Sequence, residues 1–206
     1  MTPFTRFSGI AAPFNEDSVD TDVIFPARYL LLLDLAGLGA RAFHDRRYTP
    51  EGDERGDFVL NRDPWRTATI LVAGANFGCG SSREQAVWCL ADFGIRCVIA
   101  GSFGDIFAAN CINNGVLPVA LAPEPLARVS AAAAAGEALT IDLEARTIEG
   151  PGFATLTLPI ADKAREALLA GRDTLGMILE THGEAFARFE AGHRAARPWL
   201  TRTTGD

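Results

Sequence analysis

The stretch TILVAGANFGCGSSREQAVWCLADF, residues 69–93, contains the clearest indication of the fold in this sequence. It opens with a continuous apolar run at 69–73, which has the length of a buried strand. A glycine-rich turn follows at 74–82, and residues 83–93 then place apolar side chains at helical spacing until Gly94. A strand, a glycine turn and a helix in this order predict an α/β unit, with the turn at the carboxyl end of the strand.

The same alternation continues through the middle of the chain. Apolar runs predict strands at 96–100 and 116–121, and a helix at 104–114 lies between them and ends at Gly115. Strands that alternate with helices favour a parallel or mixed sheet with covering helices.

The second half of the chain has a different pattern. Its apolar spacing predicts two more helices, a hairpin and a strand: helices at 125–135 and 160–170, a hairpin at 139–150 and a strand at 153–158.

One domain accounts for most of the chain. A length of 206 residues suffices for one domain with a hydrophobic core, and we assign residues 1–193 to it. Residues 194–206 are polar and interrupted by proline, which predicts a C-terminal tail. Residues 29–63 mix leucines, glycines and charges, and we expect a helix followed by a long loop there.

The charge and apolar content exclude two classes of partner. Lysine and arginine number 19 against 26 aspartate and glutamate residues, so the formal net charge is −7, and no basic run is present. We therefore expect no nucleic-acid partner. No apolar run is long enough to cross a bilayer and no secretory signal is visible, so we expect a cytoplasmic protein without a membrane partner.

Metal-ligand spacing is missing as well. The four cysteines, at 79, 89, 97 and 111, form no C-x-x-C pair, and the three histidines are scattered. We predict neither a zinc site nor any other metal site on this chain.

Residues 76–86, NFGCGSSREQA, form the candidate site. Ser81 and Ser82 fall at the predicted helix start and Arg83 in its first turn, after glycines such as Gly80 that let the backbone approach a ligand. Free N–H groups and the helix dipole favour an anion at this place, and arginine can grip a carboxylate with two hydrogen bonds. The group suits a small carboxylic acid.

The motif also allows two other interpretations. Ser81 with Glu84, or Ser82 with Gln85, has the spacing of a capping box, so the motif could be only a helix start. A nucleotide-binding oxidoreductase is disfavoured, because the glycine pattern is incomplete and no acid follows the second strand; a P-loop would need a lysine here.

A resemblance extends beyond the motif. NFGCGSSRE at 76–84, LADFGIRCVIAGSFGDIF at 90–107 and NNGVLPV at 113–119 resemble isopropylmalate dehydratase small subunits and the swivelling C-terminal domain of aconitase. DSVDTDVIFPARYL at 17–30 resembles the same family, as do FVLN and DLEARTI further on. The resemblance covers about residues 7–190 and implies an α/β fold of the swivelling β/β/α type.

The resemblance also implies an activity. The family members are small subunits of heteromeric hydro-lyases that isomerise 2-isopropylmalate to 3-isopropylmalate in leucine biosynthesis. Departures such as Ser18, where the family often has asparagine, leave related acids open, namely citramalate or citraconate and dimethylmalate. A non-catalytic module that binds carboxylates is a further alternative.

Site residues follow from the resemblance position by position. Ser81 matches the base that removes a proton from the substrate carbon, and Ser82 and Arg83 match the pair that holds a substrate carboxylate. Thr21 and Asp22 match a supporting segment beside the site, together with Gly80. For Asp20 and Asp22 a turn-forming or capping role is the alternative.

The family implies a cofactor that this chain does not carry. Aconitase-type enzymes use a four-iron (4Fe-4S) iron–sulfur cluster as a Lewis acid, and in this family it resides on a separate large subunit. We therefore expect no cofactor on this chain and a large cluster-bearing subunit as its partner. The cysteines here lack cluster spacing, so Cys79 is expected beside the site rather than as a ligand.

Specificity is expected to depend on the leucines of Tyr29–Leu33. In the resembling family this loop helps to read the variable side group of the substrate. Leucines can bury a branched alkyl group but cannot pair with an extra carboxylate, so Leu31 is predicted to contact the isopropyl group. Alternatively, the leucines form one face of a core helix.

Overall fold

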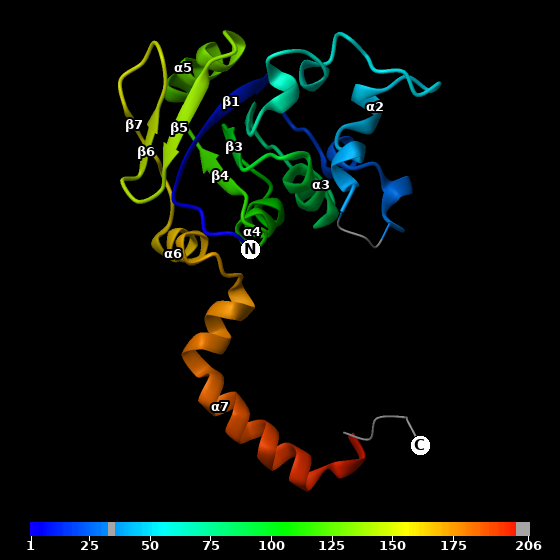
Figure 1. Ribbon diagram of the computed structural model, residues 1–206, viewed down its shortest axis with the longest axis vertical. Helices are drawn as coiled ribbons and strands as arrows, with labels where there is room; N and C mark the ends of the chain where they lie inside the picture. Colours follow the sequence, from blue (N-terminus) through cyan, green and yellow to red (C-terminus); the bar gives the residue numbers. More distant parts are fainter. Residues whose placement is uncertain (33–35, 201–206) are drawn as a thin grey trace.

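The computed structural model describes residues 1–32 and 36–200, and within them seven strands form one mixed sheet (Figure 1). The strand order is β4-β3-β2-β1-β5-β6-β7. The strands are β1 (Arg6–Phe14), β2 (Ile70–Ala73), β3 (Cys97–Ala100), β4 (Leu117–Ala120), β5 (Ala138–Asp142), β6 (Thr147–Glu149) and β7 (Leu156–Thr157). This confirms the predicted α/β class with a mixed sheet.

β1 lies between a parallel half and an antiparallel half of the sheet. It runs parallel to β2, with Ala11 opposite Ile70, and antiparallel to β5, with Arg6 opposite Asp142. The apolar pattern of the sequence predicts no strand here. The buried positions of β1 include only small residues before Phe14, so the segment shows neither a long apolar run nor a strong alternation. Its place in the sheet comes from pairing on both edges.

The parallel half is covered on both faces. Along β2, Leu71 belongs to one apolar cluster and Ile70 to the other, as successive side chains of a strand point to opposite faces. The first cluster takes in α1 (Thr21–Ile24), α3 (Gln85–Phe93) and α4 (Asp105–Asn113), and the second takes in α5 (Pro123–Ala134) and α6 (Asp162–Ala170). This two-faced burial explains why these strands are continuous apolar runs.

Most predicted elements of the middle and second half are confirmed within a few residues at each end. The hairpin at 139–150 corresponds to β5 and β6, which pair antiparallel with Ile141 opposite Ile148. The strand predicted at 153–158 is shorter, because only Leu156–Thr157 pairs with β6.

The prediction of a helix and a long loop over residues 29–63 was wrong. Short helical turns occupy the segment instead: η1 (Ala27–Tyr29), η2 (Leu38–Arg41), α2 (His44–Arg47) and η3 (Val59–Asn61), with η4 (Trp65–Thr67) just beyond. Buried side chains of these turns, such as Phe43 and Leu60, belong to the first apolar cluster. This part of the chain is therefore held in place by individual buried side chains and not by the apolar face of one amphipathic helix.

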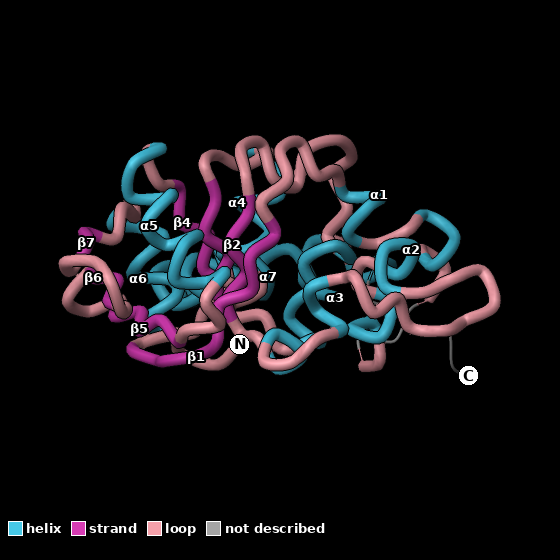
Figure 2. Tube along the Cα trace, turned by 90° about the horizontal axis from the view of Figure 1, so that it is seen from above, coloured by secondary structure: helices cyan, strands magenta, loops and turns pink. Residues whose placement is uncertain are grey.

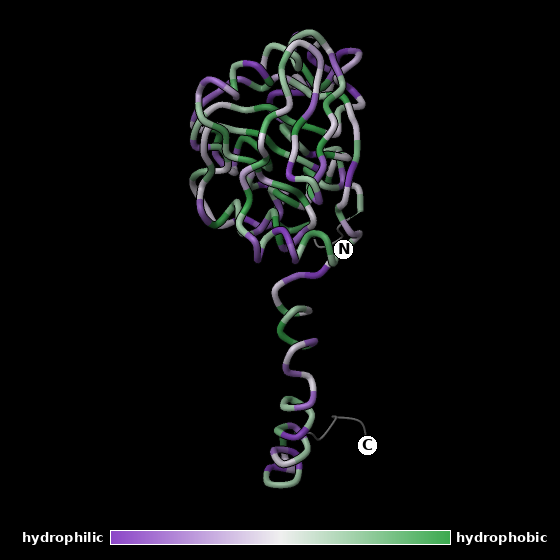
Figure 3. The backbone as a smooth tube through the Cα atoms, turned by 90° about the vertical axis from the view of Figure 1, so that its left-hand side faces the viewer, coloured by the Kyte–Doolittle hydropathy of each residue, from purple (hydrophilic) through white to green (hydrophobic). Residues whose placement is uncertain are grey.

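The C-terminal part holds a helix that the sequence analysis did not assign. α7 spans Thr174–Ala196 and extends away from the body of the molecule (Figures 1 and 3), followed by a turn, η5 (Pro198–Leu200). The predicted boundary between domain and tail at residue 193 falls inside α7, and the division itself stays a prediction. Among the residues described, no helix is long and apolar enough to span a membrane.

Candidate functional site

Two loops meet at one edge of the sheet, because β1 and β2 are parallel and end together. Two backbone hydrogen bonds join the loop after β1 to the loop after β2. Gly74 N–H donates to the Glu16 carbonyl at 3.1 Å, and Ser18 N–H donates to the Ala75 carbonyl at 2.8 Å. Figure 2 shows the loops gathered beyond the strand ends on this edge. This is the edge at which open α/β sheets bind ligands.

The glycines of the second loop serve packing as well as access. Gly78 has a φ of +72°, and a Cβ there would lie 2.2 Å from the Phe107 ring. Its N–H donates to the Val19 carbonyl at 2.8 Å, so the loop lies directly on its neighbours. Gly80, at a φ of +90°, is exposed and faces Asp20. Both positions demand a backbone conformation that favours glycine.

Thr21 attaches the first loop to the backbone of the motif. It is buried, its N–H donates to the Cys79 carbonyl at 3.0 Å, and its hydroxyl donates to the Ser81 carbonyl at 3.1 Å. Asp20, one residue earlier, accepts from Val23 N–H at 2.8 Å and caps α1, which confirms the capping interpretation for Asp20. Thr21 therefore holds the position of Ser81 across 60 residues of sequence.

Asp22 forms an ion pair with Arg83. One Asp22 carboxylate oxygen accepts from the Arg83 guanidinium and also from Ala27 N–H at 3.2 Å. The hydrogen bond from Arg83 is the main reason that the pKa of the Asp22 carboxyl lies below its ordinary value, so the pair is charged at neutral pH. The Arg83 side chain is only 18% exposed, whereas that of Asp22 is 51% exposed. The carboxylate thus orients a largely covered guanidinium.

Ser81 and Ser82 lie before the helix rather than at its first residues. α3 begins at Gln85 with Glu84 as its N-cap, and no side chain caps it, so neither predicted capping box forms. The Glu84 carboxylate instead accepts from the Asn114 side-chain amide at 2.7 Å. The prediction that Arg83 lies in the first helical turn was therefore wrong. Both serines are exposed to solvent in the loop.

The leucine segment does not form a core helix. Leu31 is 89% exposed and Leu32 is also exposed, while Leu30 is half-buried against the first apolar cluster. Leu33 lies outside the described residues. Leu31 lies four residues after Ala27, whose N–H donates to Asp22, so the leucine segment is close in sequence to the loop that holds Arg83.

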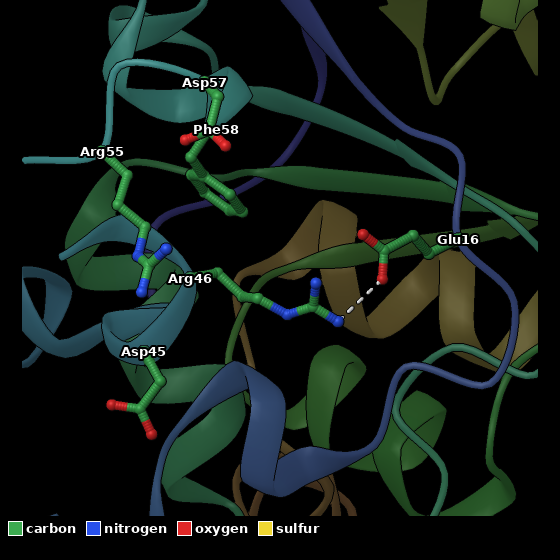
Figure 4. Close-up of a pocket in the computed structure, with 6 residues that line it drawn as sticks. All are labelled: Glu16, Asp45, Arg46, Arg55, Asp57 and Phe58. Carbon is green, nitrogen blue, oxygen red and sulfur yellow. Dashed lines mark hydrogen bonds and ion pairs between the residues drawn. The ribbon is translucent and has the colours of Figure 1, made fainter. Parts of the chain in front are cut away.

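A charged hollow adjoins the same loops and was not predicted from the sequence. It has a volume of about 420 Å³, and Figure 4 shows Arg46 donating across it to Glu16, at 3.1 Å. The other lining residues are Asp45, Arg55, Asp57 and Phe58. Nearby, Arg28 forms an ion pair with Asp45 and stacks on the Tyr29 ring. The only sequence signal for these contacts was the dense charge between residues 45 and 57.

The donor groups of the described residues do not fit a metal cluster. Among residues 1–32 and 36–200, no group of three or more His, Cys, Asp and Glu side chains could hold a metal ion. Burial raises the pKa of the thiols of Cys89, Cys97 and Cys111, which therefore stay protonated, whereas cluster ligands are thiolates. Cys79 is half-buried and pairs through its backbone with Asp20, next to the candidate site.

Comparison with known proteins places the chain in a family. The model of the aconitase C-terminal domain matches residues 1–124. The 3-isopropylmalate dehydratase small subunits of Dinoroseobacter shibae and Rhodospirillum centenum are 48% and 49% identical to it; each match spans 97% of this chain and 100% and 98% of the relative.

A solved structure agrees with these matches. The crystal structure of 3-isopropylmalate dehydratase from Methanocaldococcus jannaschii superposes with a TM-score of 0.62 at 28% identity, over 89% of this chain and 98% of the other. The chain therefore belongs to the aconitase C-terminal domain family and, within it, to the 3-isopropylmalate dehydratase small subunits.

Proposed function

We propose that this chain is the small subunit of a hydro-lyase that interconverts 2-isopropylmalate and 3-isopropylmalate in leucine biosynthesis. The names of its relatives support this activity, and the loop geometry supports it from within the molecule. The observation that carries the proposal is the attachment of the first loop to the motif: the Thr21 hydroxyl donates to the Ser81 carbonyl, and the Asp22 carboxylate accepts from the Arg83 guanidinium.

Ser81 acts as the base in this proposal. Its hydroxyl oxygen removes a proton from the carbon next to a carboxylate, the hydroxyl group leaves the adjacent carbon, and a double bond forms between the two carbons. Addition of water with the opposite orientation gives the isomeric acid. A serine oxygen can serve in this way only if its negative charge is stabilised, and the N–H groups of the glycine loop around Gly80 are suitable donors.

Arg83 and Ser82 hold the substrate carboxylate. Arginine offers a planar fork that matches a carboxylate with two hydrogen bonds, and Asp22 keeps that fork in place. A substrate carboxylate therefore meets an arginine whose orientation is already set, which lowers the cost of ordering the side chain upon binding.

The site needs a second protein surface. Ser81 and Ser82 are exposed in this chain, whereas electrostatic stabilisation of a transition state is far stronger where water is excluded. The iron–sulfur cluster implied by the family does not fit the donors described here, and we assign it to the large subunit. We further propose a cytoplasmic complex, without nucleic-acid or membrane partners.

The test of this function is dependence on the partner. The chain is purified anaerobically alone and together with a large subunit from a relative, then assayed with isopropylmalate, citramalate and dimethylmalate. We expect activity only in the mixture and highest with isopropylmalate. A chain that is brown and active by itself would contradict the proposal, and preference for citramalate or dimethylmalate would reassign the substrate.

The leucine segment yields a prediction on specificity. Leu31→Arg is expected to lower kcat/KM for isopropylmalate on the order of 10-fold, since contact with an alkyl group contributes about 0.8 kcal/mol per methylene-sized unit. Steady-state kinetics of the assembled enzyme measure this effect, with a tricarboxylate analogue as second substrate. Leu200→Arg, at an exposed leucine outside the loop, is the control. If the folded and assembled Leu31→Arg enzyme keeps the same preference for isopropylmalate over the tricarboxylate analogue, Leu31 does not determine substrate specificity.

A further inference from the structure

α7 presents a stripe of leucine, phenylalanine and histidine side chains along its length. Every residue of this helix is described, and none is buried. The stripe residues follow one another at intervals of four and three: Leu175, Leu179, His182, Phe186, Phe189 and His193. The Phe189 and His193 rings stack at 5.5 Å between centroids, so the stripe is continuous on one face of the helix.

An exposed helix of this composition needs a covering partner. Gly176, Gly183 and Gly192 lie inside α7, and an interior glycine costs about 1 kcal/mol relative to alanine. Most helices in proteins are stabilised by packing of an apolar face rather than by propensity. Here Leu175 is 62% exposed and Phe189 is 68% exposed. The N-terminal turn of α7 contacts the body of the molecule through Thr174 and Asn113, at 2.7 Å, but these leucine and phenylalanine side chains stay exposed, which marks an interaction surface.

The spacing indicates that the partner is itself a helix. Alternating intervals of three and four residues give a period of about 3.5, which keeps a stripe facing another helix along a coiled coil. The side chains also leave a hollow of about 370 Å³, lined by His182, Ala185, Phe186 and Phe189. A hollow between side chains of one helix is where a side chain of a facing helix inserts.

The stripe is complementary to itself when the second helix runs in the opposite direction. Its members lie two, five and nine residues on either side of Glu184. Antiparallel copies centred there would pair His182 with Phe186, Leu179 with Phe189, and Leu175 with His193. Parallel copies would instead place each histidine against its own counterpart.

Charge favours the same arrangement. Residues 174–184 carry two glutamates and no lysine or arginine, whereas residues 185–197 carry three arginines and one glutamate. An antiparallel pair sets the acidic half of each helix beside the basic half of the other, and it also opposes the two helix dipoles favourably.

We propose that α7 pairs with α7 of a second copy of this chain as an antiparallel two-helix coiled coil. Gly176, Gly183, Ala185 and Gly192 flank the stripe and let the two backbones approach closely. The dimer leaves the Ser81 loop of each copy free for a large subunit, because that loop lies at the sheet edge and not on α7. The inference is independent of the proposed function.

Sedimentation velocity on the full chain without large subunit tests this pairing. The wild type should sediment as a dimer of two 22.0 kDa chains at micromolar concentration. Phe189→Glu should raise the dimer dissociation constant by at least about 100-fold, since both copies lose an apolar contact and place a charge in the seam. Ala191→Glu, on the other face of α7, is the matched control and should stay dimeric. Circular dichroism confirms that each variant folds.

Disulfide trapping tests the direction of the pair. A Leu179→Cys, Phe189→Cys double variant should form a covalent dimer under mild oxidation, because the two positions face each other only in the antiparallel arrangement. Each single variant should remain largely uncrosslinked. These variants also show how much crosslinking comes from Cys79, the half-buried native thiol. Equal crosslinking of the single variants would overturn the antiparallel arrangement.

Three further results would overturn the proposal. A wild-type chain that stays monomeric to about 100 µM would exclude a specific dimer, and a Phe189→Glu chain that dimerises like wild type would place the contact elsewhere. A monomeric chain whose Phe189→Glu variant alone fails to bind the large subunit would assign the stripe to that subunit instead.

Discussion

Replacing Ser81 with alanine in the assembled enzyme should lower kcat by about 10²- to 10⁴-fold, the range typical for removal of a general base. The fold should be unaffected, because Ser81 is exposed and the contact that Thr21 makes here is with the Ser81 carbonyl, which alanine retains. Steady-state kinetics with isopropylmalate give the effect on kcat, and thermal unfolding of the small chain shows that stability is unchanged.

Ser8→Ala is the matched control for Ser81. Ser8 is a serine of β1 that shares a hydrogen bond with Thr140 at 2.7 Å, on the side of β1 where it pairs with β5 rather than β2. Its loss should leave kcat within experimental error. A near-normal kcat in Ser81→Ala would show that Ser81 is not the base. The role proposed for Arg83 would then still be tested separately, by the substitution described next.

Replacing Arg83 with lysine should raise KM by about 10- to 100-fold and change kcat much less. A point charge cannot reproduce the two parallel hydrogen bonds of the guanidinium fork, and a hydrogen bond to a charged group contributes about 1.5–3 kcal/mol. The loss should be felt in substrate binding, since the carboxylate is held in the ground state and the transition state alike.

Arg146→Lys is the control for this substitution. Arg146 also forms an ion pair with an aspartate, Asp162, but on the hairpin and α6 side of the molecule. Its kinetics should equal those of the wild type. A fall in kcat with unchanged KM in Arg83→Lys would contradict a binding role and show that the guanidinium acts in the chemical step.

The ion pair of Asp22 and Arg83 sets a lower pH limit for this arrangement. The pKa of the Asp22 carboxyl is lowered from its ordinary value of 3.8, so the carboxylate is still ionised when the pH falls to 3.8. The ion pair is lost only as the pH falls further, through the lowered pKa. Changes of activity near neutral pH must therefore come from other groups. The exposure of Asp22 keeps its contribution to stability small.

The strands β2, β3 and β4 and the position of the motif could be predicted from the amino-acid sequence. Continuous apolar runs of five or six residues, each followed by a turn and a helix with periodic apolar spacing, are signals within a short stretch of sequence and do not depend on distant contacts. The motif was found for the same reason: Gly80, Ser81, Ser82 and Arg83 are consecutive, so their proximity needs no folding.

The contacts that other segments make with the motif could be known only from the folded structure. The pairing of Asp22 with Arg83 joins residues 61 positions apart, and no periodicity in the sequence encodes such a distance. The start of α3 at Gln85 was likewise decided at a distance, because Asn114 engages the carboxylate of Glu84 that a capping box would have used. β1 became a strand through its two neighbours, since small residues carry little local preference. Local patterns report what a segment can bury, whereas long-range hydrogen bonds and ion pairs depend on which segments the fold brings together.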